Sequence, residues 1–289
     1  SDLLGVDVLP DGTAVAVGEG GLVLTIRDGR IGSRPSGTDA DLNAVSGRYA
    51  VGDAGALLDL GLSPVQEIAT GTQADLVDVW ADDEGAWIAA ADGSLFRLDP
   101  DGVRLEVRRG ISLTSVCASG GDRWVGGVDG RLEMNDTEGD RLLPTDSGAT
   151  LRDLAPAGDR VIAVGDNGLA LECGLSDCRS LFEDPAAFLY GVHRQANRTV
   201  AAGGAGLVLV RDGNAPFVPL DTGTFRVFRD VSADADGTVW QRGSGEIPIE
   251  EIDRLAQELV AGEAPTADDS SNDGLQTPVD LESGDSGSN

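Results

Sequence analysis

One apolar pair recurs along the chain at nearly constant spacing, and this period constrains the fold more than any other feature. The pair follows the pattern L-x-x-V or a close variant of it, and successive copies begin 39, 34, 37, 38, 38 and 39 residues apart. A period of this length identifies a repeat architecture, in which each repeat forms one supersecondary unit. The seven copies are Leu3/Val6, Leu42/Val45, Leu76/Val79, Leu113/Val116, Leu151/Leu154, Leu189/Val192 and Phe228/Val231.

Each repeat reads as about four short strands joined by tight turns. Residues 13–18 and 22–27 alternate with a period of two, as strands do. Asp-Gly pairs such as Asp11-Gly12 supply the positive φ that hairpin turns need. A G-x-x-G motif such as Gly52/Gly55 follows most L-x-x-V pairs, and we expect it to turn sharply between the second and third strands, where a Cβ would clash.

A four-stranded unit repeated radially predicts an all-β fold, a β-propeller over residues 1–243. Six repeats are complete, whereas the seventh supplies only two strands, in residues 226–243. Seven blades with an incomplete last blade is therefore the main prediction. Because no strand is expected before Leu3 to complete that blade, six blades with the extra strands packed outside the ring is the alternative.

The period changes after the repeats. Residues 244–261 are predicted to hold one amphipathic helix, starting at Pro248, which either caps the propeller or binds a partner by its apolar stripe. Residues 262–289 contain seven acidic and no basic residues, which predicts a disordered acidic tail. The apolar stripe of the helix consists of Ile249, Ile252, Ala256, Leu259 and Val260.

The charge of the chain limits the classes of partner that we expect and indicates the salt concentration in which the protein works. The net charge is −29, and all 21 basic residues are Arg. Such a chain repels phosphate backbones and anionic lipid headgroups, so no nucleic-acid partner is expected. Concentrated salt screens carboxylate repulsion and favours short, well-hydrated side chains over Lys, so the composition favours an extreme halophile. GC-rich coding is the alternative explanation for the absence of Lys.

No apolar run is long enough to span a membrane and no secretion signal is visible, so we expect no membrane insertion and a cytoplasmic location. Cys173 and Cys178 bracket a short loop, where a disulfide, two free thiols or half of a metal site could form. A disulfide would favour an extracellular location. With Cys117 and the single His193 as the only other thiol and imidazole, no metal site and no cofactor are predicted.

The repeat units resemble those of a known propeller family. Leu42-Asn-Ala-Val followed by residues 50–58 is similar to the repeats of photosystem II assembly and stability factor-like propellers, within the wider sialidase-type (BNR) group. Residues 80–93 also resemble blades of two-component-regulator sensor propellers. The resemblance implies a propeller fold, with protein-binding or assembly roles in several members and glycan hydrolysis in others.

Two functions are therefore expected. The first is a non-catalytic interaction or scaffold module that binds a protein partner, as a monomeric propeller or as a subunit of a larger complex. It is favoured because the chain has no recognisable nucleophile–base pair, cofactor loop or metal set. The alternative is a carbohydrate-active enzyme that uses paired carboxylates at the mouth of the channel, such as Asp78 and Asp153.

Overall fold

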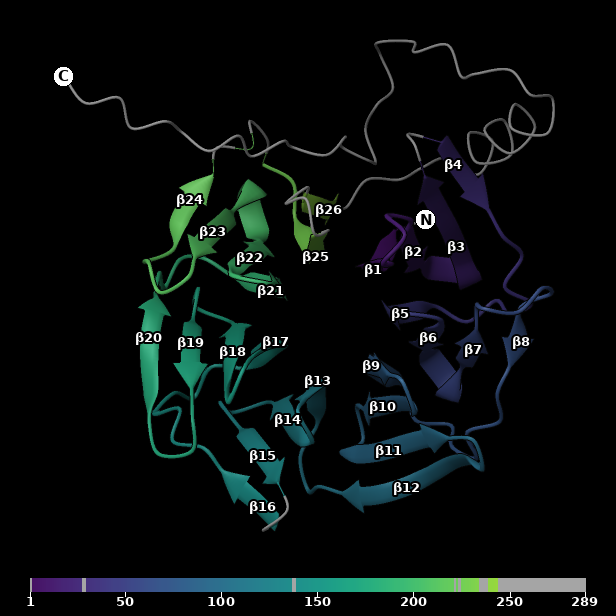
Figure 1. Cartoon of the computed structure of the whole chain (residues 1–289), viewed down its shortest axis with the longest axis horizontal. Coiled ribbons are helices and arrows are strands. Elements are labelled where there is room, and N and C mark those ends of the chain that lie inside the picture. The colour runs from purple at the N-terminus through teal and green to yellow at the C-terminus, as the bar shows by residue number, and fades with distance from the viewer. Residues whose placement is uncertain are drawn as a thin grey trace.

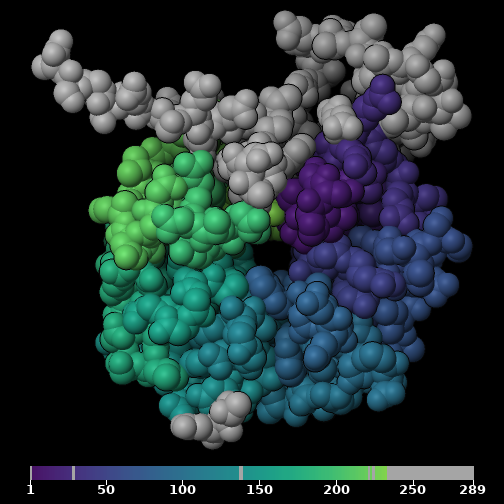
Figure 2. All heavy atoms as spheres, in the orientation of Figure 1, coloured from purple at the N-terminus to yellow at the C-terminus, as the bar shows by residue number. Residues whose placement is uncertain are grey.

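The predicted propeller is confirmed. The computed structural model describes residues 2–27, 30–136, 139–220, 222, 225–233 and 239–243. Its antiparallel sheets are arranged radially around a central opening (Figures 1 and 2), with the chain passing from one blade to the next around the ring. In every blade the strand that carries the L-x-x-V pair lies innermost, which is why this pair repeats once per blade.

Six sheets have four strands each, paired in sequence order. The first is β1 (Leu3–Val8), β2 (Ala14–Gly18), β3 (Leu22–Arg27) and β4 (Arg30–Ser33), and the second is β5 (Leu42–Ser46), β6 (Tyr49–Gly52), β7 (Leu57–Asp59) and β8 (Gln66–Glu67). The third is β9 (Leu76–Asp82), β10 (Gly85–Ala90), β11 (Ser94–Asp99) and β12 (Gly102–Arg108), and the fourth is β13 (Leu113–Ser119), β14 (Asp122–Gly127), β15 (Leu132–Asp136) and β16 (Gly139–Leu142). The fifth is β17 (Leu151–Ala157), β18 (Arg160–Gly165), β19 (Ala170–Cys173) and β20 (Cys178–Phe182), and the sixth is β21 (Leu189–Gln195), β22 (Arg198–Gly203), β23 (Val208–Asp212) and β24 (Val218–Leu220).

Within the described ranges the number of four-stranded blades is six, as in the alternative, and the main prediction of seven blades is not matched. A further two-stranded sheet is formed by β25 (Phe228–Ala233) and β26 (Val239–Gly243). This pair does not pack outside the ring, because β25 contacts both β21 and β1 and lies between the sixth and the first blades (Figure 1). A hydrogen bond from the Val6 backbone N–H to Asp230 Oδ2 (2.8 Å) joins the two ends of the ring.

The G-x-x-G motif makes the turn between the second and third strands, as predicted. In the second blade this turn is the 3-10 segment Asp53–Gly55, and equivalent 3-10 turns occupy Glu19–Gly21 and Gly204–Gly206. A Cβ on Gly52 would lie 2.0 Å from the Asp41 carbonyl oxygen, and a Cβ on Gly55 would lie 2.2 Å from that of Thr72. Gly55 also has a φ of 78°, which favours glycine. The motif is therefore wedged between the chain entering its own blade and the chain entering the next.

The hydrophobic core lies in the seams between neighbouring blades. The seam between the fourth and fifth blades, for example, contains Trp124, Leu132, Leu151 and Leu154, all buried. Comparable clusters join the first blade to the second, the second to the third and the fifth to the sixth. Burial of apolar area at roughly 25 cal/mol per Å² makes these seams the main stabilising contacts of the ring.

The predicted helix within residues 244–261 and the predicted acidic tail at 262–289 lie outside the described residues. Within the part of the chain that the structure describes, no helix is long and apolar enough to cross a membrane.

Candidate functional site

Three carboxylates occupy the same repeat position on the innermost strands. Asp78 on β9, Asp153 on β17 and Asp230 on β25 each stand third in L-x-x-V or its variant, and we call them the inner-strand carboxylates. Each accepts a hydrogen bond from the backbone N–H of the next residue and another from the innermost strand of the following blade. The bonds between blades run from Val116 N to Asp78 (2.7 Å), Val192 N to Asp153 (2.7 Å) and Val6 N to Asp230 (2.8 Å).

Close approach of the innermost strands explains why these carboxylates are separated by small residues. The same position holds Gly5, Ala44, Ser115 and Gly191 in the other four copies. A Cβ on Gly191 would lie 2.8 Å from Asp230 Cα, and a Cβ on Gly5 would lie 2.9 Å from Ala44 Cα. Two large side chains cannot stand side by side there, so one carboxylate spans each seam where it occurs.

Ser115 connects two of the inner-strand carboxylates. Its Oγ lies 2.7 Å from Asp78 Oδ2 and 3.1 Å from Asp153 Oδ1. A hydroxyl has one proton to donate, so both contacts are hydrogen bonds only if one carboxyl group is protonated. Burial deep in the ring raises the pKa of Asp78 to about 6, although the side chain keeps a little exposed surface.

Burial raises the pKa of Asp153 well above its ordinary value, and repulsion from Asp78 and Asp230 adds to this effect. One of the two carboxyl groups therefore keeps a proton while the other is ionised, and Ser115 donates to the ionised one. Such a chain can hold and release a proton. The same oxygens also accept backbone N–H groups from neighbouring blades, so the carboxylates connect the blades whatever else they do.

Cys173 and Cys178, for which the sequence left three possibilities open, lie opposite each other in the hairpin of β19 and β20. Cys173 pairs with Cys178 in the register, and their sulfur atoms are bonded. Cys117 is buried on β13, and burial raises its thiol pKa well above the ordinary value. His193 is half-buried on β21, opposite Val200 in the register. Among the described residues, no three His, Cys, Asp or Glu side chains gather as a metal site would require.

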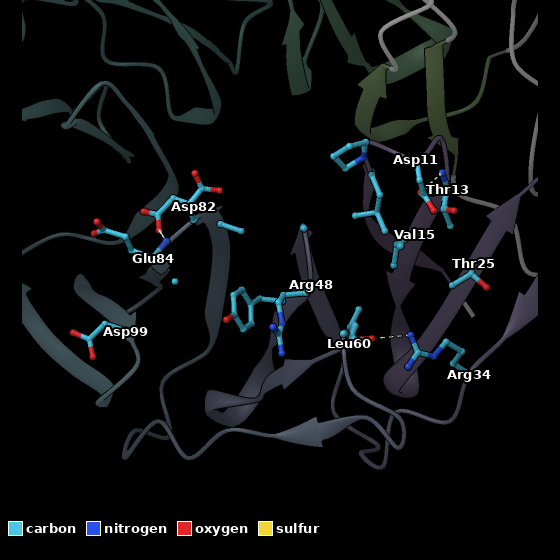
Figure 3. A pocket seen from close by; sticks show the side chains of 18 of the residues that line it. Asp11, Thr13, Val15, Thr25, Arg34, Arg48, Leu60, Asp82, Glu84 and Asp99 are labelled. Atoms are coloured by element: carbon cyan, nitrogen blue, oxygen red, sulfur yellow. Dashed lines mark hydrogen bonds between the residues drawn. The ribbon is translucent and has the colours of Figure 1, made fainter.

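A groove of about 880 Å³ crosses one face of the first three blades (Figure 3). We call it the blade 1–3 groove. Its lining comes from the turns that connect the first strand to the second in these blades and the third to the fourth in the second and third blades, so loops distant in sequence converge on one depression. The lining includes apolar Leu9, Pro10, Val15, Tyr49, Leu60 and Pro100, and charged Asp11, Arg34, Arg48, Asp82, Asp83, Glu84 and Asp99.

The two arginines of the blade 1–3 groove are committed to the protein itself. Arg34 donates to the carbonyl oxygens of Leu60 (2.8 Å) and Leu62 (2.9 Å), and so ties the first blade to the second (Figure 3). Arg48 is paired with Asp59 and lies over the Tyr49 ring, with its guanidinium carbon 5.5 Å from the ring centroid. Asp59 therefore neutralises Arg48, whereas Arg34 donates to neutral carbonyl oxygens and keeps its positive charge beside the groove.

The acidic groups on the opposite wall differ in their partners. Arg97 donates to both oxygens of Asp82 (2.7 and 2.9 Å), and these hydrogen bonds hold the pKa of Asp82 below its usual value. Asp99 is paired with Arg104. Glu84 has a side chain 90% exposed and reaches Arg97 only at 3.9 Å, and no described cation pairs with Asp83. The β9–β10 turn therefore presents acidic charge that the protein does not neutralise.

Sequence reasoning identified the inner-strand pair Asp78 and Asp153, and the structure brings them together through Ser115. It did not identify the blade 1–3 groove. The available signal was the acidic run Asp82-Asp83-Glu84 at a hairpin turn, which in so acidic a chain does not stand out.

Comparisons with known proteins identify the fold. No protein-family model matches the sequence, and no curated protein matches it. Among solved structures, the chain is similar to YCF48 bound to D1 peptide, with 15% identity, a TM-score of 0.65 and coverage of 84% of this chain and 89% of that one. It is also similar to the WD40 β-propeller domain of Doa1, with 15% identity, a TM-score of 0.70 and coverage of 84% and 90%.

A third similar structure is YCF48 from Cyanidioschyzon merolae, with 16% identity, a TM-score of 0.63 and coverage of 83% of this chain and 92% of that one. At these identities the likeness shows the β-propeller fold alone. The predicted resemblance to assembly-factor propellers is supported to that extent, and neither the BNR-type assignment nor adaptation to salt follows from it.

Proposed function

We propose that this chain is a non-catalytic interaction module that binds a segment of a protein partner in the blade 1–3 groove. The single observation that carries the proposal is the combination of apolar lining residues with Asp83, unpaired among the described residues, and the largely exposed Glu84 on one wall. Apolar contacts would provide affinity and the acidic wall would select residues that carry Arg or Lys. The likeness to a propeller whose structure holds a peptide supports a binding role for this fold.

The partner segment is expected to combine apolar and basic side chains. Molar salt shortens the Debye length to about 3 Å, so the acidic wall acts only on groups that lie in or next to the groove. Contact with Tyr49 and the exposed Pro10 should therefore dominate the affinity at high salt.

A photo-crosslinking residue in place of Tyr49 tests the site in the full chain. The crosslinked partner peptide is sequenced, synthesised and titrated against wild type, Asp83→Arg/Glu84→Arg and a control. The control is Asp122→Arg/Asp159→Arg, which changes charge at the corresponding hairpins of the fourth and fifth blades. The proposal expects the first double variant to weaken binding about tenfold, or about 1.4 kcal/mol, and the control to bind as wild type. Equal affinities of all three proteins would place the site elsewhere.

We also infer that the module works at high salt. The net charge of −29 and the absence of Lys support this inference. Among the described pairs the cation is always Arg, as in the buried pair of Arg211 with Glu172 (3.0 Å). Far-UV circular dichroism after dialysis into dilute buffer tests the inference: the strand signal should be lost, and an unchanged spectrum would contradict it.

A glycoside hydrolase is the second candidate, because one observation favours it: two carboxyl groups of raised pKa share the Ser115 hydroxyl. The engagement of their oxygens with backbone N–H groups argues for the binding module instead. Hydrolysis of chromogenic glycosides that is abolished in Asp153→Asn, with the circular dichroism spectrum unchanged, would reverse this preference.

A further inference from the structure

An apolar pocket lies on the other face of the ring from the blade 1–3 groove, beside the sixth blade. Its volume is about 750 Å³, and its lining comes from the connection that leads into β21, the turn Gly204–Gly206 and the connection that leads into β25. Its aromatic members are Phe188, Tyr190 and Phe225. We call it the blade 6 pocket.

The aromatic side chains of the blade 6 pocket are unusually exposed. Phe225 is 91% exposed and Phe188 is 43% exposed, and the Phe188 ring stacks on Tyr190 with centroids 6.3 Å apart. Large apolar side chains gathered at one depression are a sign of a covered surface. The backbone beneath them is well tied, because Gly206 N–H donates to the Arg226 carbonyl oxygen (2.6 Å) and Thr222 Oγ1 to that of Gly206 (2.8 Å).

The chain leaves the ring next to this pocket. In the β25–β26 pair, Phe228 is the register partner of Gly243, and Phe225 lies three residues before Phe228. Residues 244–247 alone separate Gly243 from the predicted helix, and at about 3.4 Å per residue they reach roughly 14 Å. The apolar stripe Ile249, Ile252, Ala256, Leu259 and Val260 is thus tethered within reach of the exposed aromatic rings.

The charges near the pocket are mixed. Residues 248–261 carry four acidic side chains and one basic one, Arg254. The pocket has one acidic lining residue, Asp184, and both Arg229 and Asp230 stand nearby on β25. The apolar stripe and the short tether therefore carry the match between segment and pocket, and charge does not.

We propose that residues 248–261 of the same chain occupy the blade 6 pocket, with the stripe of Ile249, Ile252 and Leu259 covering Phe188 and Phe225. A short tether gives the segment an effective concentration in the millimolar range, so even a modest apolar match is occupied. The segment then acts as an intramolecular cap of the sixth blade and of the two-stranded sheet, and is not the partner-binding element.

Hydrogen exchange measured by mass spectrometry on the full chain tests this proposal. Wild type is compared with Ile252→Asp/Leu259→Asp and with the charge-neutral control Arg254→Gln/Glu258→Gln, which changes the opposite side of the predicted helix. In the apolar-stripe variant, exchange in 186–190, 204–207 and 249–260 should accelerate about tenfold, and the control should match wild type. Equal exchange of 204–207 in wild type and in the apolar-stripe variant overturns the proposal.

A change on the pocket side separates this effect from loss of helix. Phe225→Ser removes an exposed ring and should accelerate exchange in 249–260, whereas Leu142→Ser, which removes a 62% exposed side chain from the fourth blade, should not. Protection in 249–260 that is unaffected by Phe225→Ser overturns the proposal. Protection that declines on tenfold dilution of wild type also overturns it, in favour of a second copy of the chain as the occupant.

Discussion

The buried carboxyl group of Asp78 should make the stability of the ring depend on pH in the direction opposite to that of an ion-paired carboxylate. Burial raises the pKa of Asp78 from 3.8 to about 6, so between these values the folded protein keeps a proton that the unfolded chain has released. Its contribution to stability is complete below the unfolded pKa and is lost as the pH rises through about 6.

The magnitude follows from the shift. At 1.36 kcal/mol per pKa unit the whole change is about 3 kcal/mol, of which about 2 kcal/mol falls between about pH 4.5 and about pH 7.5. The pKa values of Asp153 and Asp7 are also raised by burial, so both act in the same direction. Ion-paired Asp82 and Asp212 have lowered pKa values, and their contributions are already complete at the acidic end of this range.

The assay is denaturant unfolding at the two pH values in molar KCl, where repulsion among surface carboxylates is screened. In Asp78→Asn, one of the N–H groups of Val79 and Val116 must face an amide NH₂, which costs about 1–3 kcal/mol at both pH values. The variant should therefore be less stable than wild type at about pH 4.5 and approach it at about pH 7.5. Asp83→Asn, which removes an exposed charge, should keep the wild-type pH slope.

Two results would refute the reasoning. One is a wild-type stability that does not fall across this range, which would mean that burial does not raise the proton affinity of the inner-strand carboxylates. The other is a wild-type slope retained in Asp78→Asn, which would assign the dependence to other groups.

Three further outcomes are expected. Leu151→Ala, which empties a fully buried site in the seam between the fourth and fifth blades, should lower the free energy of unfolding by about 2–5 kcal/mol in urea titrations, and a loss within error of zero would contradict the seam as the core. Arg211→Met should cost about 1–3 kcal/mol, because it removes one charged hydrogen bond from Glu172, which keeps Arg179 as a partner. Arg27→Met at an exposed pair should cost less than about 1 kcal/mol, as thermal unfolding would show. Alkylation of the unfolded, unreduced protein should label Cys117 alone, and labelling of all three cysteines by mass spectrometry would exclude the disulfide.

The propeller fold could be predicted because the same packing and turn requirements recur in each blade. Each innermost strand needs an apolar pair such as Leu42 and Val45 to fill a seam, and each second turn needs glycine because a Cβ would strike a carbonyl oxygen of the adjoining connection. Local chemistry recurs once per blade, so the sequence displays it as a period.

The number of complete blades was harder to predict, because it depends on the end of the chain. The strands β25 and β26 were expected from the sequence, but their place between the sixth and first blades rests on contacts between residues far apart in sequence, such as Val6 with Asp230. Because every residue type except Pro has a backbone N–H, the donor residue in such a hydrogen bond cannot be recognised from the sequence.

The blade 1–3 groove could not be predicted for a similar reason. It is assembled from turns of three blades, and its charge depends on which carboxylates find an arginine. Asp82 finds Arg97 across the hairpin, whereas the neighbouring Asp83 has no such partner among the described residues. Two adjacent residues of the same type thus acquire different roles only when the strands of the third blade pair with one another.

The closure of the ring has a consequence for how the chain can be rearranged. Since β25 lies against β1 and Asp230 accepts a hydrogen bond from Val6, the two ends of the described propeller are spatial neighbours. A circular permutant that joins them by a short linker and begins instead in the connection 143–150 would keep every contact between blades. The backbone of the ring can therefore be interrupted at several equivalent connections, and the fold depends on the order of the blades around the ring.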